Sequence, residues 1–548
     1  MNNKFLIGTL PILLSPASLS AAEKKQAADR PNIILIMADD MGYSDFGFMG
    51  AGIETPNLDK LSSNGLLFTN FYNAGRSCPT RASLLTGLYA HQTGLGWMTS
   101  SNLGHPGYTG DMNNQAVTIA QVLKTADYAC YMTGKWHVTF DNFMKPEGPK
   151  HNWPIQRGFD RFFGHLSGGG GYFKPSTLTN DNEQIDAPDG FYLTTAVTDS
   201  TVSILNHHFN KKEQDPFFFY VAYYAPHRPL HALQEDVAKY RGKFMDGWDE
   251  QRKKRYDKMR ELNILKPQHT LSERDAQIPP WDDLSEEDKL IWDARMAVYA
   301  AQIDRMDQGI GKIIETLEAN DALDNTLILF LTDNGGNAEN QGGKLTLEQL
   351  PLLGNEEPAQ SYRLNWGNVS NTPFREYKRY THEGGIATPL IAHWPAKIKQ
   401  GGILTSQQGH VIDFMPTFIE MAEAKYPKSF NGHEIHSLPG KSLLPTLTKA
   451  KTFKRGTLYF EHEASRAIID GDWKLVSKST KTPPYTSDWE LFNLKEDRAE
   501  TRNLIQQYPR KAAKLAEMWD KWAKQNQVYP LDNSGWTGKN AKDQGVPM

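Results

Sequence analysis

Runs of apolar residues that end in polar ones recur along this chain and predict the strands of a buried sheet. Five such runs lie at 32–40 (NIILIMADD), 128–137 (YACYMTGKWH), 217–227 (FFFYVAYYAPH), 326–336 (TLILFLTDNGG) and 387–394 (ATPLIAHW). Nearly continuous apolar strands are typical of a parallel sheet whose two faces are covered by helices. We therefore expect an α/β fold.

Between the third and fourth runs the pattern predicts a long amphipathic helix. Apolar residues recur every three or four positions from Met296 to Leu317, and Ser285 with Asp288 forms a capping-box pattern upstream. This stripe is expected to belong to the core. The charged segment 235–290 reads as helices and loops, whereas 166–173 and 337–372 have the composition of long irregular loops.

From about residue 456 the pattern changes to short strand-like runs, GTLYFEHE, SRAIIDGDWKLV and DWELFNL, which predict a small antiparallel sheet. A helix is expected to follow from about residue 504. We divide the chain into a signal peptide at 1–22, a catalytic domain at 30–450 and a C-terminal subdomain at 451–548 with the small sheet and the helix.

The first 22 residues have the pattern of a secretory signal peptide. Lys4 precedes an apolar run that reaches Leu14, and small residues follow up to Ala21 and Ala22. No later segment contains about 18 consecutive apolar residues, so no membrane span is expected. We predict an exported protein, either periplasmic or secreted.

Composition adds three constraints. A chain of 548 residues that is 39% hydrophobic can bury a sizeable core. A net charge of −4 gives no global basic field, so no nucleic-acid partner is expected. Only Cys78 and Cys130 are present, so the fold cannot depend on a disulfide framework, and a bridge between them is not expected.

Polar side chains follow four of the apolar runs at the point where each run ends. Because ligands bind beyond the carboxyl ends of parallel strands, these residues are expected to share one edge of the sheet. Each alone has an ordinary explanation as a turn residue or a hydrogen-bonded histidine, but their joint occurrence favours a site. The residues are Asp39, Asp40, Lys135, His137, His227, Asp333 and Asn334.

Three carboxylates and an amide oxygen in this set suit a hard divalent cation such as Ca²⁺ or Mg²⁺. The predicted edge contains neither a cysteine nor the clustered histidines that zinc prefers.

At this point the motifs resemble the type I sulfatases of the alkaline phosphatase superfamily. The resemblance covers nearly the whole chain after residue 30, from PNIILIMADDMGYSD through SCPTRASLLTG, YMTGKWH, YYAPHRP, TDNGG and KRYTHEGGIATPLIAHWP to WELFNLKEDRAETRNL. The family signature is Cys or Ser, any residue, Pro, any residue, Arg. With Pro79 and Arg81 in place, the first position is Ser77, and Cys78 is the variable second position.

The resemblance implies an alkaline phosphatase-like fold, with a large mixed, mostly parallel sheet between helices. It further implies a Ser-type enzyme, in which a sulfatase-maturing enzyme oxidises Ser77 to formylglycine (3-oxoalanine). One Ca²⁺ would be held by Asp39, Asp40, Asp333 and Asn334 together with residue 77.

The resemblance also implies roles for the remaining site residues. Arg81 would support the formylglycine and the ion site, while Lys135 and Lys378 would bind the sulfate oxygens. Lys378 is placed by its offset of five residues before Glu383. His137 would act as the base that lets sulfate leave, and His227 would contact the sulfate or protonate the bridging oxygen.

Three alternatives stay open at this stage. Ser77 is also a good N-cap for the helix TRASLLTGLY. A two-zinc phosphatase or phosphodiesterase would share the sheet, although Asp333-Asn334 departs from the Asp-His pair that it needs. A catalytically silent carbohydrate-binding protein is the third.

The expected substrate is a sulfated saccharide or an aryl sulfate. His105, Arg375 and His382 are candidates for contacting hydroxyl groups beside the sulfate. Aromatic residues in the predicted loops either stack on sugar rings or belong to the core; they are Trp97, Tyr108, Trp153, Phe173 and Trp366.

Overall fold

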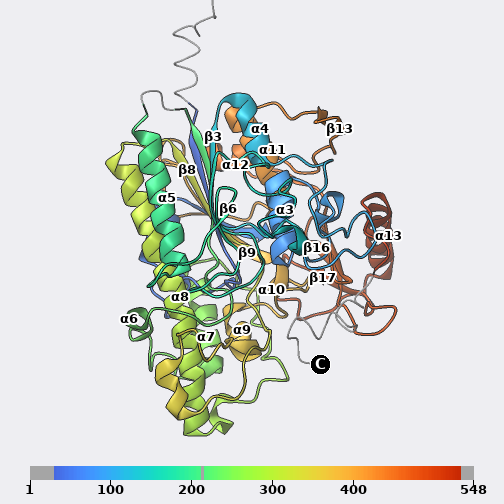
Figure 1. Cartoon of the computed structure of the whole chain (residues 1–548). Helices are drawn as coiled ribbons and strands as arrows, with labels where there is room; N and C mark the ends of the chain where they lie inside the picture. Colours follow the sequence, from blue (N-terminus) through green and yellow to red (C-terminus); the bar gives the residue numbers. More distant parts are fainter. Residues whose placement is uncertain (1–29, 212–214, 532–548) are drawn as a thin grey trace, which may run out of the picture.

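The computed structural model describes residues 30–211 and 215–531 (Figure 1). The predicted signal peptide at 1–22 therefore lies outside the described residues. Among the described residues, no helix combines the length and apolar character needed to cross a bilayer.

A large mixed sheet forms the centre of the molecule. Its strand order is β10-β2-β9-β8-β1-β7-β3-β4-β5-β6, and β11 pairs with a further part of β2. The strands are β1 (Asn32–Ala38), β2 (Leu66–Tyr72), β3 (Ala129–Lys135), β4 (Arg161–His165), β5 (Leu178–Asn180), β6 (Glu183–Gln184), β7 (Phe217–Ala222), β8 (Thr326–Thr332), β9 (Ala387–His393), β10 (Ile403–Thr405) and β11 (Gly409–His410).

Strand direction in this sheet follows the prediction except at β9. The strands β8, β1, β7, β3 and β4 are mutually parallel, so their carboxyl ends share one edge. The run at 387–394, expected as a further parallel strand, is antiparallel to both β8 and β2. Strand β2 itself was not predicted, because Thr69 and Asn70 interrupt its apolar run. The fold class, mixed and mostly parallel, is confirmed.

Helices cover both faces of the sheet, and each face has its own core (Figure 1). Side chains of β1 alternate between the two cores: Ile34 and Ile36 pack on one side, Ile33 and Leu35 on the other. One face carries α5 (Leu193–Phe209) and α8 (Glu286–Ala319); the other carries α3 (Ser77–Thr86), α4 (Ile119–Leu123), α11 (Phe414–Ala422) and α12 (Leu444–Lys449).

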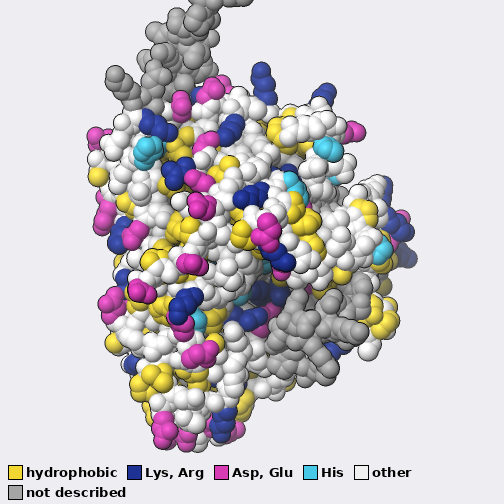
Figure 2. Space-filling model, in the orientation of Figure 1, with side chains coloured by type: hydrophobic (Ala, Val, Ile, Leu, Met, Phe, Trp, Pro, Cys, Tyr) yellow, Lys and Arg dark blue, Asp and Glu magenta, His cyan; other side chains and the backbone are white. Residues whose placement is uncertain are grey.

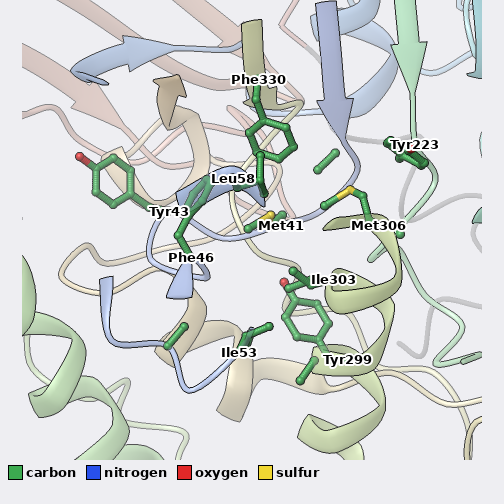
Figure 3. Close-up of a cluster of buried hydrophobic side chains, with 14 of the residues drawn as sticks. Met41, Tyr43, Phe46, Ile53, Leu58, Tyr223, Tyr299, Ile303, Met306 and Phe330 are labelled. Carbon is green, nitrogen blue, oxygen red and sulfur yellow. The ribbon is translucent and has the colours of Figure 1, made fainter. Parts of the chain in front are cut away.

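The predicted long helix is α8, and it supports the loop that follows β1. Its N-cap is Ser285, whose side chain accepts a hydrogen bond from the Asp288 backbone N–H, as the capping pattern predicted. Figure 3 shows Tyr299, Ile303 and Met306 of α8 in one apolar cluster with Met41 and Phe46. The segment after β1 is thereby fixed on the helix.

The remaining helices lie mostly in the charged segment and the long loops. They are α2 (Pro56–Ser63), α6 (Gln234–Val237), α7 (Gly247–Glu261), α9 (Arg363–Ser370) and α10 (Glu383–Ile386). Short 3-10 helices lie at η1 (Gly47–Met49), η2 (Ala90–Thr93), η3 (Lys124–Ala126), η4 (Asp141–Phe143), η5 (Trp281–Asp283), η6 (Leu347–Leu352) and η7 (Val411–Asp413). The loop prediction holds for 166–173 but was wrong for 363–370, which forms α9.

The C-terminal part contains the expected antiparallel sheet and helix. The strands β14 (Leu458–His462), β15 (Ser465–Asp470), β16 (Trp473–Ser477) and β17 (Glu490–Asn493) pair in chain order. Helix α13 (Pro509–Gln525) packs Leu515 and Trp519 against Ile468 of this sheet. A separate hairpin joins β12 (Ser429–Phe430) and β13 (His433–Glu434). The predicted domain boundary at 450–451 remains a prediction.

Candidate active site

The parallel strands deliver their polar residues to one place, as the sequence predicted. Backbone hydrogen bonds hold neighbouring strand ends together. The Asp333 N–H donates to Ala38 O at 3.1 Å, and the Asp39 N–H donates to Ala225 O at 3.0 Å. All seven strand-end residues are buried, and His227, the most exposed of them, exposes only 7% of its surface. The convergence follows from the parallel register of β8, β1, β7 and β3.

Two of these residues adopt a left-handed backbone conformation. Asp40 has a φ of 67° and His137 a φ of 54°. Non-glycine residues rarely adopt such values, and they concentrate at functional sites where the surrounding contacts hold them. The His137 N–H donates to Leu166 O at 3.0 Å, which helps to fix its position.

Ser77 is the first residue of α3 and points at the carboxylates. Its Oγ lies 3.1 Å from Oδ1 of Asp39 and 3.3 Å from Oδ1 of Asn334. The N-cap of α3 is Arg76, and no side chain caps the helix. The capping explanation for Ser77 was therefore wrong. The hydroxyl instead stands in the partial positive field of the helix N-terminus, which favours a bound anion.

Each of the three carboxylates has a cationic partner. Lys135 Nζ lies 2.5 Å from Oδ2 of Asp39, and Lys378 Nζ lies 2.6 Å from Oδ1 of Asp40. The carboxylate of Asp333 is paired with Arg81, whose NH2 lies 3.1 Å from Oδ2. The sequence prediction of Lys378 rested only on its offset, and the structure brings it to the same cluster.

Asp40 is the most heavily contacted of the carboxylates. Besides Lys378, it accepts hydrogen bonds from Asn334 Nδ2 at 2.7 Å and from Asn337 Nδ2 at 2.8 Å. Nε2 of His227 lies 3.6 Å from its Oδ2. Asn337 was not singled out from the sequence, although it stands only three residues beyond Asn334.

Burial and charge act in opposite directions on the pKa values here. Burial alone would raise the pKa of Asp39, but the charges of Lys135 and Arg81 outweigh it and hold that pKa well below its usual range. Burial, with the charge of Asp39 added, raises the pKa of Asp333 to about 7. A carboxylate of raised pKa beside a second carboxylate is typical of sites that bind a cation or move a proton.

Both histidines are held neutral in this arrangement. Burial lowers the pKa of His227 to about 3, although the neighbouring Asp40 opposes the shift. Burial and the charge of Lys135 lower the pKa of His137 well below its ordinary value. His137 packs directly on Gly168, where an added Cβ would lie only 2.1 Å from its Nε2. The position of the His137 ring therefore requires glycine at position 168.

The donor set fits a hard cation. Asp39, Asp40 and His227 each offer a ligand atom, and these atoms lie within 4.8 Å of one another. Oxygens of Asp39 and Asn334 also converge on the Ser77 hydroxyl. Carboxylate, amide and hydroxyl oxygens are the ligands that Ca²⁺ and Mg²⁺ prefer. His227 adds one nitrogen that an all-oxygen site would not use.

A cavity of about 640 Å³ opens over the cluster. Ser77, Lys135, His137, His227 and Lys378 line its floor together with the loop 168–171. Figure 2 shows a hollow near the middle of the face displayed, in which basic, acidic and histidine side chains gather. A small anionic group can therefore reach the Ser77 hydroxyl and the two lysines at once.

The cavity has a charged wall that sequence reasoning missed. Glu339 pairs with Arg76 at 2.9 Å and with Arg228 at 3.0 Å, and all three line the cavity. Arg76 directly precedes Ser77, and Arg228 directly follows His227. These positions beside two predicted site residues were the signal that could have identified the arginines. Their shared partner could not be found from the sequence, because Glu339 lies in a segment without a periodic pattern.

The structure does not bring the three hydroxyl-reading candidates to the cavity. His105 is exposed in its loop, while Arg375 and His382 contact Glu490 of β17 at 2.7 and 3.2 Å. Among the described residues that line the cavity, none is one of the five aromatic candidates. Trp97, Tyr108, Trp153 and Trp366 are buried, and Phe173 packs against the core. Their role in the core, rather than in stacking on sugars, is what the structure supports.

Comparisons with known proteins agree with this geometry. A family model described as Sulfatase matches residues 31–424, which is most of the chain, and a model described as N-sulphoglucosamine sulphohydrolase, C-terminal matches residues 375–527. The chain belongs to the sulfatase family. This confirms the resemblance to the sulfatases of the alkaline phosphatase superfamily and decides against the phosphatase alternative. The protein is a sulfuric ester hydrolase.

Similar sulfatases span most of this chain. An arylsulfatase of Klebsiella aerogenes is 32% identical over 81% of this chain and 96% of its own length. An uncharacterized sulfatase of Schizosaccharomyces pombe is 30% identical, covering 91% and 94%. The crystal structure of Ps i-CgsB in complex with k-i-k-neocarrahexaose is 27% identical, with a TM-score of 0.65 over 95% of this chain and 98% of that one.

Proposed function

We propose that this sulfatase removes sulfate from sulfated glycans with a formylglycine nucleophile formed from Ser77 and with one bound Ca²⁺. The observation that carries the proposal is the position of the Ser77 hydroxyl. It stands at the N-terminus of α3, 3.1 Å from Asp39 and in a cavity that Lys135 and Lys378 also line.

The proposed nucleophile requires a maturing enzyme that oxidises the Ser77 side chain to an aldehyde. Once hydrated, the aldehyde supplies two hydroxyl groups, one to attack sulfur and one whose deprotonation releases sulfate. Ser77 lines the cavity, whereas its neighbour Cys78 is not among the lining residues and is fully buried, with Sγ 3.2 Å from Trp97 O. Burial also raises the pKa of the Cys78 thiol to about 12, so position 78 is unsuited to nucleophilic chemistry.

We assign the metal site to Asp39, Asp40, Asp333 and Asn334 together with residue 77. The Ca²⁺ would polarise the nucleophile and neutralise charge on the sulfate. Arg81 anchors this set, because its guanidinium binds Asp333 and donates to Lys135 O at 2.9 Å.

The cations and histidines supply the remaining chemistry. Lys135 and Lys378 bind sulfate oxygens and stabilise the charge that develops there. His227 donates a proton to the bridging oxygen as the alcohol leaves, and His137 accepts a proton when sulfate is released. A bound sulfate ester favours protonation of His227 because it brings negative charge to that imidazole.

The glycan substrate is proposed from the relatives and from the cavity. N-acetylgalactosamine-6-sulfatases of mouse and human are each 27% identical to this chain, and Ps i-CgsB was solved with a bound neocarrahexaose. The charged wall formed by Arg76, Glu339 and Arg228 provides donors and acceptors for sugar hydroxyls. We also propose that the protein is exported, on the signal-peptide pattern at 1–22.

The test is release of inorganic sulfate from a panel of monosulfated mono- and disaccharides and an aryl sulfate. The protein is produced with and without a serine-oxidising maturing enzyme, and matched phosphate esters serve as controls. Turnover of sulfated sugars only after maturation supports the proposal. Turnover of phosphate esters in preference, or equal activity without maturation, contradicts it, and sugar binding without any turnover points to a binding protein.

A further inference from the structure

The segment from Arg375 to Glu383 lies between the catalytic cluster and the C-terminal sheet. Lys378 extends from it toward the cluster, with Nζ 2.6 and 2.9 Å from the two carboxylate oxygens of Asp40. Its side chain is only 4% exposed. Everything that fixes the backbone of this segment therefore bears on where the Lys378 ammonium stands.

The C-terminal sheet fixes the opposite side of this segment through charges. Four of its nine residues make ion pairs with residues between 463 and 490, and a fifth, His382, makes a hydrogen bond to Glu490. Arg375 and His382 both bind Glu490, Glu376 binds Lys478 at 2.8 Å, Arg379 binds Glu463, and Glu383 binds Lys474 at 2.9 Å. Figure 1 shows α10, which begins at Glu383, beside β16 and β17.

The innermost of these contacts is sealed from solvent. Lys474 is fully buried between Glu383 and Glu500, with Nζ 2.8 Å from Oε1 of Glu500. Oε2 of Glu500 also accepts the backbone N–H of Glu383 at 2.9 Å. Apolar residues of the same volume often stabilise a fold as well as a buried ion pair does. These hydrogen-bonded ion pairs also fix the orientation of the 375–383 segment, which an apolar interface would fix less well.

We infer that the C-terminal sheet positions Lys378 in the active site, with Glu490, Lys478 and Lys474 as positioning residues. The inference rests on the proposed role of Lys378 as a ligand of the sulfate. Lysine is a flexible point charge whose placement depends on the backbone that carries it. Small displacements of a group that binds the reacting centre lower the rate strongly. Arg375 and His382 then act through Glu490 on the segment, and not on a sugar.

The experiment uses Glu490→Ala in the matured full-length enzyme, because Glu490 is 31% exposed and holds two of the contacts. Glu496→Ala, an exposed glutamate just beyond β17, is the matched control. Lys478→Met breaks an independent contact at a side chain that is 42% exposed. Each is made in the wild-type and in the Lys378→Ala background, and kcat/KM, the inhibition constant for inorganic sulfate and the melting temperature are measured.

We expect Glu490→Ala and Lys478→Met to lower kcat/KM about tenfold and to weaken inhibition by sulfate in the wild type, with roughly twofold effects or less in the Lys378→Ala background. Glu490→Gln, which can still accept hydrogen bonds, should restore part of the loss. Glu496→Ala should change neither constant. Equal losses in both backgrounds, or unchanged sulfate inhibition, overturn the inference. If Lys378→Ala itself changes nothing, the proposed role of Lys378 fails instead.

Discussion

Asp40 and Asp45 stand in the same loop after β1, and comparing them shows what separates a carboxylate of the candidate site from a structural one. Both are buried and both face a cation. Asp45 binds Arg255 at 2.6 Å, the Tyr299 hydroxyl at 2.7 Å and the Gly42 N–H at 2.9 Å. None of these residues is among those that line the cavity.

Asp40 has equally short contacts, but two of its partners line the cavity. Lys378 and His227 both line it, next to Ser77. Burial with an ion pair therefore does not identify a site by itself, since Asp45 has both. What marks Asp40 is that its partners remain available to a ligand. The following changes test this distinction, beginning with the largest expected effect.

Ser77→Ala should remove the nucleophile and lower sulfate release by roughly 10⁴-fold or more. The melting temperature should change little, because the Ser77 hydroxyl caps no helix. Cys78→Ala, one residue along α3, should keep most of the activity and lose about 1 kcal/mol of stability, since it removes only a buried thiol. A reversed ranking in a sulfate-release assay would refute the assignment of residue 77.

Asp40→Asn and Arg255→Met should separate activity from stability. We expect Asp40→Asn to lower kcat/KM roughly 10²-fold or more, because it weakens the ion site and its contact with Lys378. Arg255→Met leaves the Asp45 carboxylate buried without its cation, so the free energy of unfolding should fall by about 3–5 kcal/mol. The folded fraction of that variant should retain normal kcat/KM. Denaturation curves and steady-state kinetics together measure both effects.

Chelation should inactivate the matured enzyme reversibly without unfolding it. The proposed site is built from carboxylate and amide oxygens, so Ca²⁺ should restore activity and Zn²⁺ should not. The Asp45 cluster binds its own Arg255 and should keep the loop folded during the treatment, which circular dichroism can follow. Elemental analysis that finds zinc, with recovery only by zinc, would contradict the proposed metal.

The two histidines should differ in the step that each serves. With a chromogenic aryl sulfate in excess, matured His137→Ala should release roughly one equivalent of phenol and then stall, because its step follows departure of the alcohol. His227→Ala should show no burst and should lose more activity on sugar sulfates than on aryl sulfates, whose phenolate leaves without help. Steady turnover by His137→Ala, or equal losses on both substrates by His227→Ala, would reverse the assignment.

The sequence predicted the parts of this molecule that depend on local pattern. The apolar runs of β1, β3, β7 and β8 and the stripe of α8 are visible because burial imposes them residue by residue. Strand direction is not visible in this way, and β9 was expected to be parallel to its neighbours. Strand β2 was missed because its Thr69 and Asn70 interrupt the apolar pattern.

The site residues show the same difference between what a local sequence pattern predicts and what it does not. Asp39, Lys135 and Asp333 could be predicted to meet, because the ends of parallel strands share an edge. The bridge from Arg76 through Glu339 to Arg228 joins loops far apart in the sequence, and no local pattern records it. Arg375 and His382 carried chemistry suited to sugars, yet their actual partner, Glu490, lies more than a hundred residues away.

Peptide mass spectrometry of residue 77, in protein fractions of different specific activity, tests most directly whether Ser77 is the precursor of the nucleophile. We expect the peptide containing Ser77 to lose a pair of hydrogen atoms on maturation, and the aldehyde fraction to rise in proportion to sulfate release. A hydrazide probe should label the same peptide, and Ser77→Ala should show neither the mass change nor the label. Full activity in protein whose Ser77 is unmodified would show that Ser77 is not the precursor of the nucleophile.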